Sequence, residues 1–114
     1  MESDPRFNCA VDAAMSVIEG RWKSTIICLL AQSKEMRFNE LLRKIDGVSS
    51  RILSKQLKEL EADGMILRRE YGESARRVSY SLTEKGSSLL PILSDLARWG
   101  RENMFSNRVN IDTA

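Results

Sequence analysis

The sequence contains no histidine, only two cysteines and two prolines, and no long hydrophobic run. Histidine and clustered cysteines are the usual zinc ligands, and histidine is the commonest general acid or base. Nor is there a glycine-rich phosphate-binding loop. No apolar run approaches the roughly 20 residues that span a bilayer, and no signal peptide is recognisable at the start. We therefore expect a cytoplasmic protein with no metal, cofactor or membrane anchor, and not an enzyme.

The length and composition of the chain are those of a single small domain. The chain has 114 residues, of which 42% are hydrophobic and 30% are charged, enough for one core but not two. The net charge of +2 says little about partners. The positions of the charges say more, because residues 47–58 hold three basic residues and no acidic one. Residues 68–77 hold four basic residues and two acidic ones.

Hydrophobic periodicity predicts mostly helices. Apolar residues recur at helical spacing over residues 9–19, 22–31 and 38–44. A further helix is expected to begin after Thr83 as its N-cap and to run for some 18–20 residues, with a kink or one lost backbone hydrogen bond at Pro91. We expect a flexible arm over residues 1–8, one domain over residues 9–106 and a flexible tail over residues 107–114.

The segment from Gly47 to Gly64 is the most informative part of the chain. Ser49 or Ser50 is a suitable N-cap, and leucines at helical spacing would face inward. The outward face is basic in its first half, against the preference of the helix dipole for acids there. Such a face suits a negatively charged partner, although a solvated surface could show the same pattern. Its candidate contact residues are Ser49, Ser50, Arg51, Ser54, Lys55 and Lys58.

A turn containing glycine joins the helix predicted over residues 38–44 to this basic helix, which is the arrangement of a helix-turn-helix motif. Two strand-like runs follow, over residues 65–71 and 78–82. They predict a β-hairpin, or wing, whose tip carries Arg76 and Arg77. We expect these two arginines to contact phosphates or the minor groove. Arg68 and Arg69 are as easily explained by solubility and protection of a strand edge.

The last predicted helix has more apolar surface than one small core can use. Trp99, Met104 and Phe105 lie near its end. An apolar surplus of this kind favours a partner, and a second copy of the chain is the simplest one. We therefore expect a homodimer.

The two cysteines are interpreted differently. Cys28 lies in an apolar run and is expected to be a small, inaccessible core residue. Cys9 lies at or before the first turn of a helix, where the dipole can favour a thiolate. It is a candidate redox-sensing residue, with packing as the alternative.

Four segments together resemble the HxlR-type bacterial transcriptional regulators, relatives of the MarR winged-helix proteins. They are CAVD from Cys9, GRWK from Gly20, the helix GVSSRILSKQLKELEADGMI and RVSYSLTEKG from Arg77. The resemblance covers most of the chain, from about Cys9 to Gly100. It implies a mainly α winged helix-turn-helix fold of five or six helices with a two- to three-stranded wing sheet. It also implies a homodimer built from the first and last helices, which binds a pseudo-palindromic DNA operator.

Within this resemblance, the outward residues of the basic helix match the family's recognition helix, and Arg77 matches the arginine that closes the wing. Ala75-Arg76 replaces the two prolines common before that arginine, Ser79 replaces an acid, and Ala10 replaces the proline that usually follows the cysteine. In some members this cysteine senses quinones, electrophiles or oxidants. The expected function is thus a DNA-binding regulator, more often a repressor or autoregulator. The alternative is a winged-helix module that binds proteins instead of DNA.

Overall fold

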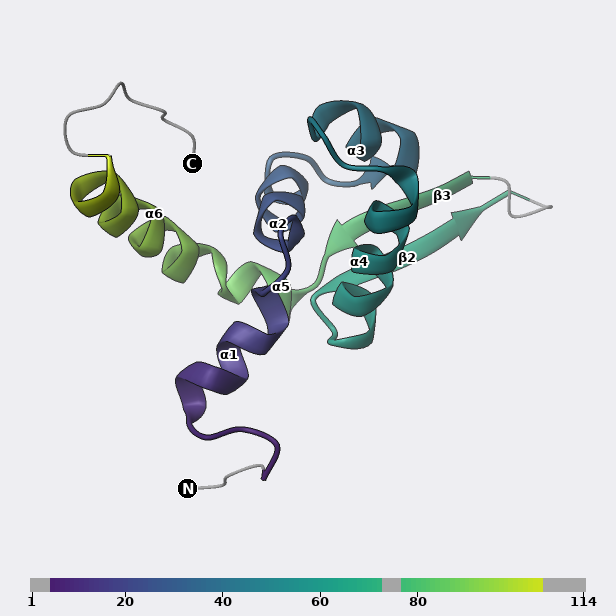
Figure 1. The fold of residues 1–114 in the computed structure, drawn as a ribbon. Coiled ribbons are helices and arrows are strands. Elements are labelled where there is room, and N and C mark those ends of the chain that lie inside the picture. Colours follow the sequence, from purple (N-terminus) through teal and green to yellow (C-terminus); the bar gives the residue numbers. More distant parts are fainter. Residues whose placement is uncertain (1–4, 73–76, 106–114) are drawn as a thin grey trace.

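A computed structural model describes residues 5–72 and 77–105 of the chain, and this part contains six helices and three strands (Figure 1). The elements in chain order are α1 (Ala10–Ile18), α2 (Lys23–Ala31), β1 (Met36–Arg37), α3 (Phe38–Lys44), α4 (Ser50–Ala62), β2 (Ile66–Tyr71), β3 (Arg77–Leu82), α5 (Glu84–Ser88) and α6 (Leu90–Met104). The mainly helical winged fold expected from the sequence is confirmed.

The core lies where α2, α3 and α4 meet the small sheet. Its fully buried side chains are Ile26, Ile27, Leu30, Leu41, Leu53, Leu57 and Leu60. In α4 the three leucines are spaced by four and three residues, so that they fall on one face, whereas α2 adds the adjacent pair Ile26 and Ile27 together with Leu30. Tyr80 of β3 closes the core from the sheet side. These contacts bury the leucine face of α4 and leave its opposite face exposed to solvent.

The sheet is antiparallel with the strand order β1-β3-β2, so β3 is its central strand. Tyr71 lies opposite Arg77 at the tip end of the β2–β3 hairpin, and Ile66 lies opposite Leu82 at its base. Alternation along β3 turns Val78, Tyr80 and Leu82 toward the core, as the sequence predicted. Figure 1 shows the hairpin extending away from the helices as a wing.

The C-terminal helix differs from the sequence-based prediction. Two helices replace the single kinked one, because the chain breaks at Leu89 between α5 and α6. Pro91 lies in the first turn of α6. There its missing N–H leaves no helical hydrogen bond unmade, so proline starts a helix and does not bend one. The predicted N-cap is confirmed, since the Thr83 hydroxyl oxygen accepts from the Gly86 N–H at 3.0 Å.

Helices α1 and α6 project from this body on the side away from the wing (Figure 1). No residue of α1 is buried, and α6 buries only Leu93. Exposed large hydrophobic residues on these two helices and just after them are Val11, Met15, Ile92, Leu96, Trp99, Met104 and Phe105. None of the helices in the described residues is long and apolar enough to cross a membrane.

Candidate nucleic-acid interface

Helix α4 presents a basic stripe to solvent. Arg51, Lys55 and Lys58 are all exposed, and their spacing of four and three residues places them one above another on the helix. The first turn of α4 contains no acid. The N-terminal half therefore adds side-chain charge to the positive end of the helix dipole. This is a favourable surface for an anionic ligand such as a phosphate backbone.

The three serines predicted to join this surface differ in their surroundings. Ser49 is the N-cap, and its hydroxyl oxygen accepts from the backbone N–H of Ile52 at 3.1 Å. Ser50 is exposed, whereas Ser54 is half-buried. Five of the six candidate side chains thus reach the surface, and Ser54 lies at its edge. Ser49 can still donate its hydroxyl hydrogen while it caps the helix.

The wing places Arg77 at its outer end. Arg77 is exposed and begins β3 opposite Tyr71. Arg76 lies outside the described residues. Arg68 is held at 2.6 Å by Glu70 on the same strand, which fits the structural role considered for it from the sequence. Among the described residues near the tip of the wing, Arg77 is therefore the cation that could contact DNA.

A carboxylate just before β1 fastens the wing to the body. Glu35, just before β1, accepts hydrogen bonds from the Ser79 hydroxyl at 2.6 Å and from the Tyr71 hydroxyl at 2.9 Å. These two donors lower the pKa of Glu35 below its usual value, with smaller help from the charges of Arg69 and Lys34. Ser79 is buried although its side chain is on the face of β3 opposite to Val78 and Tyr80. The link holds β2 and β3 to the segment that precedes α3.

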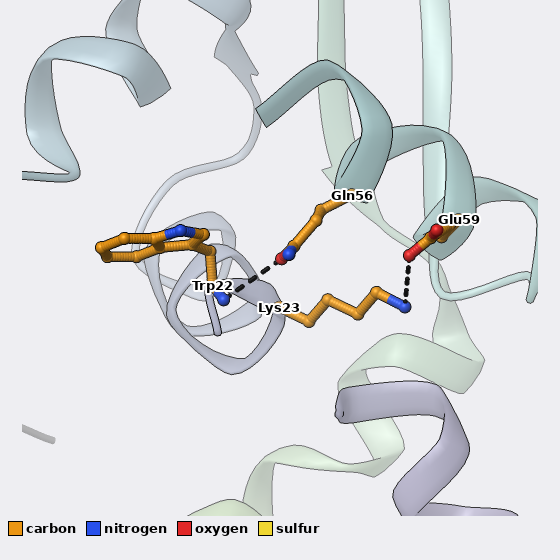
Figure 2. A network of polar contacts seen from close by, with 4 residues as sticks. All are labelled: Trp22, Lys23, Gln56 and Glu59. Atoms are coloured by element: carbon orange, nitrogen blue, oxygen red, sulfur yellow. Dashed lines mark hydrogen bonds and ion pairs between the residues drawn. The ribbon is translucent and has the colours of Figure 1, made fainter. Parts of the chain in front are cut away.

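A second polar link joins the start of α2 to α4 (Figure 2). The backbone N–H of Trp22 donates to Gln56 Oε1 at 3.1 Å, and Lys23 Nζ lies 2.8 Å from Glu59 Oε1. Only 5% of the Lys23 surface is exposed. These contacts are not predictable from the sequence, because the partners are more than 30 positions apart and no periodic pattern indicates them.

The two cysteines have different surroundings in the structure. Cys9 is exposed at the N-cap position of α1, and its side chain makes no capping hydrogen bond. Cys28 packs against the core, as expected, but it is not inaccessible. Cys28 is half-buried and lines an open hollow of about 760 Å³ that Leu29, Leu93 and Phe105 also line. Helix α2 packs on the core with its other face, so Cys28 meets the hollow. Burial raises the pKa of the Cys28 thiol.

A helix pair joined by a tight turn, followed by a two-stranded hairpin, defines a winged helix-turn-helix protein. A family model described as HxlR-like helix-turn-helix matches residues 17–108. The chain belongs to this family, as the sequence segments suggested. It is 51% identical over 89 residues to an HTH-type transcriptional regulator of Halalkalibacterium halodurans, covering 78% of this chain and 79% of that protein.

Solved structures agree with this assignment. The redox regulator HypR in its reduced form matches with a TM-score of 0.77 and 38% identity, covering 83% of this chain and 93% of that one. The reduced form of the transcriptional regulator YodB from B. subtilis matches with a TM-score of 0.75 and 31% identity, over 84% and 94% of the two chains. The chain is therefore a transcriptional regulator of the HxlR type.

Proposed function

We propose that this regulator binds double-stranded DNA by placing α4 in the major groove and the wing against the adjacent backbone. The observation that carries the proposal is the exposed stripe of Arg51, Lys55 and Lys58 on a helix whose opposite face is locked into the core. Arginine near the start of such a helix can reach base edges, and the lysines can reach bases or phosphates. Ser49, Ser50, Ser54 and the wing arginines Arg76 and Arg77 complete the proposed interface.

The DNA-binding unit is proposed to be a homodimer formed through α1 and α6. Leu96 and Trp99 support this, with 51% and 57% of their surfaces exposed, in a helix that uses Leu93 for its own core. Apolar surface of this extent on two neighbouring helices is typical of an interface. A twofold dimer presents two copies of α4, and the operator is then a pseudo-palindrome with half-sites about 10 base pairs apart. We propose that the protein acts through such a site in the cytoplasm, as a repressor or an autoregulator.

The alternative, a module that binds proteins through α4, is less well supported. Interaction helices usually present apolar or aromatic anchors at the centre of their surface. Along α4, all of which the structure describes, Ile52 is the one large hydrophobic side chain that is exposed. Ile52 lies at the flank of the helix beside Gln56 and Glu59, whereas the outermost face carries Arg51, Lys55 and Lys58, which fit DNA better than a protein groove.

Regulation by thiol chemistry is proposed for Cys9. This residue is exposed and begins α1, one of the two helices assigned to the dimer interface. An adduct or disulfide there would alter packing between subunits and so change the distance between the two α4 helices. The structural similarity to HypR, which is named a redox regulator, supports the proposal.

Selection of bound DNA from a random pool tests the proposed function. The purified protein is incubated with random duplexes, and the retained DNA is sequenced over successive rounds. Enrichment of an inverted repeat supports DNA reading by a dimer. Retention without enrichment of any sequence would contradict a specific operator, and no retention at low salt would favour the protein-binding alternative.

A further inference from the structure

The segment that joins α1 to α2 contacts the helix-turn-helix at two separate places. The Trp22 indole lies against the turn between α3 and α4, where a Cβ added to Gly47 would stand 3.5 Å from Trp22 Cη2. Its backbone N–H and the next side chain, Lys23, reach Gln56 and Glu59 on α4 (Figure 2). We call Trp22, Lys23, Gln56 and Glu59 the joint.

Gly20 allows the two halves of the joint to approach. Its backbone has a φ of +121°, a conformation that side chains rarely tolerate. A Cβ there would stand 3.4 Å from Gln56 Nε2 and 3.5 Å from Lys23 Cδ. The lysine stem and the glutamine amide therefore pack over a bare backbone, and α4 is held close to the start of α2.

The ion pair of the joint is placed against local preference on both helices. Lys23 is the first residue of α2, where the positive end of the dipole disfavours a cation. Glu59 lies in the last turn of α4, where the negative end disfavours an acid. Neither charge helps its own helix, so the stabilisation comes from the contact between the helices. Lys23 is the first cause of the lowered pKa of Glu59.

The joint also lies beside the proposed DNA-binding surface. At about 100° per residue, Gln56 and Glu59 fall between the leucine face of α4 and the stripe that contains Lys55. Lys55 is four residues before Glu59 on α4, so the two lie on adjacent turns of the same side, and the charge of Lys55 adds to the lowering of the Glu59 pKa. A rotation of α4 about its own axis would therefore break the contacts of the joint and, at the same time, turn the basic stripe to a different direction.

We propose that the joint is a positioning element that fixes the rotation of α4, so that Lys23, Gln56 and Glu59 are positioning residues for sequence reading although none of them reads a base. The proposal rests on the proposed function of α4 in DNA binding. It makes a distinctive claim about Glu59. Removing an acid near DNA ordinarily strengthens binding, whereas removing this acid weakens recognition of the operator.

The first test compares Glu59→Gln with Glu61→Gln, which removes an exposed acid of the same helix. Affinities for the selected operator and for a scrambled duplex are measured by fluorescence anisotropy, and their ratio is taken. The ratio does not depend on the fraction of active protein, so partial unfolding cannot imitate the effect. We expect Glu59→Gln to lower the ratio by about tenfold, the equivalent of one base contact, and Glu61→Gln to leave it unchanged. Equal ratios in the two variants would overturn the proposal.

The second test uses substitutions that keep side-chain size. Gln56→Met removes the acceptor for the Trp22 N–H without changing charge, and Lys23→Met removes the buried cation. Each is expected to lower the ratio, and the double variant Lys23→Met with Glu59→Gln should lower it no further than the single variants, because both break one contact. Losses that multiply in the double variant would show independent effects and contradict a shared contact.

A third measurement needs no DNA and separates the two proposals. The chain has two tryptophans, so Trp99→Phe leaves Trp22 as the only indole reporter. In that background, Gln56→Met and Glu59→Gln should shift the Trp22 emission, whereas Glu61→Gln should not. If the wild type selects no DNA sequence, the proposed function fails on its own. Unchanged emission in all three variants would mean that α4 does not depend on the joint.

Discussion

The Ser79 hydroxyl donates a 2.6 Å hydrogen bond to the carboxylate of Glu35, 44 positions earlier in the chain. Tyr71 donates to the same carboxylate oxygen from the neighbouring strand. One carboxylate thus joins both strands of the wing to the segment that leads into α3. Because the donors favour the charged form, this link connects the attachment of the wing to pH.

Stability in acid should reveal the Glu35 link. The pKa of Glu35 is lowered in the folded protein, so its contribution is present above the unfolded pKa and is lost as pH falls through the folded pKa. The melting temperature of Glu35→Gln should therefore lie below that of the wild type at neutral pH, and the gap should close as the pH falls through the lowered pKa of Glu35 in the folded protein. Thermal unfolding followed by circular dichroism measures both, with Glu61→Gln as a control. A gap that stays constant over this range would show that the charge is not needed.

The wing arginines should matter for affinity and not for folding. Arg77 is exposed near the hairpin tip. Arg76→Ala combined with Arg77→Ala is expected to weaken binding to all duplexes and to reduce the slope of log affinity against log salt by about one to two units, as phosphate contacts do. Arg68→Ala, on the same hairpin, removes a cation already paired with Glu70 and should have a smaller effect. Loss of the folded circular dichroism signal in the double variant would instead assign the arginines a structural role.

The dimer prediction depends on the exposed apolar face of α6. Leu96→Glu or Trp99→Glu would bury an unpaired charge in a dimer but leave it in water in a monomer. We expect a folded protein whose mass by light scattering falls from a dimer to the 13.0 kDa of one chain. Ser94→Glu, on another face of the same helix, should remain dimeric. A wild-type protein that is monomeric at micromolar concentration would contradict the proposed dimer.

Thiol reactivity should differ between the two cysteines. Burial raises the pKa of Cys28, so less of it is thiolate at neutral pH, whereas Cys9 is exposed. Mass spectrometry after brief iodoacetamide treatment should find Cys9 modified first. Diamide or quinone should then lower operator affinity in the wild type and leave Cys9→Ser unchanged. Equal affinities in all treated and untreated samples would make Cys9 a packing residue only.

Local patterns predicted the elements of this fold well. The spacing of Leu53, Leu57 and Leu60, the cap at Ser49 and the break at Gly64 fix α4, and each depends on residues within one or two turns. The alternation in β3 fixes which face meets the core. The strand-like runs and the basic face of α4 predicted the wing and a helix that faces an anionic partner, and the family resemblance added the pseudo-palindromic operator, which composition and net charge could not supply.

Tertiary contacts account for what was missed. Two polar contacts, Lys23 with Glu59 and Glu35 with Ser79, join residues far apart in sequence. In the sequence, each of these residues resembles an ordinary polar surface residue. The apolar neighbours of Cys28 predict full burial, yet the most deeply buried residues of α2 are on its other face. Cys28 is therefore only half-buried and lines the hollow. Apolar periodicity continues through Pro91 and predicts a single helix, because the pattern does not show that the chain starts a new helix there.

The central claim is that the basic stripe of α4 reads DNA sequence, and a titration of three stripe variants tests it most directly. Affinities for the selected operator and a scrambled duplex are measured over a range of salt for Arg51→Ala, Lys55→Ala and Lys58→Ala. Arg51→Ala and Lys55→Ala should each lose about 1–3 kcal/mol on the operator and relax base preference at one position. Lys58→Ala should weaken both duplexes alike and reduce the salt slope by about one unit. Unchanged operator affinity in all three variants would contradict the assignment of α4 to the groove.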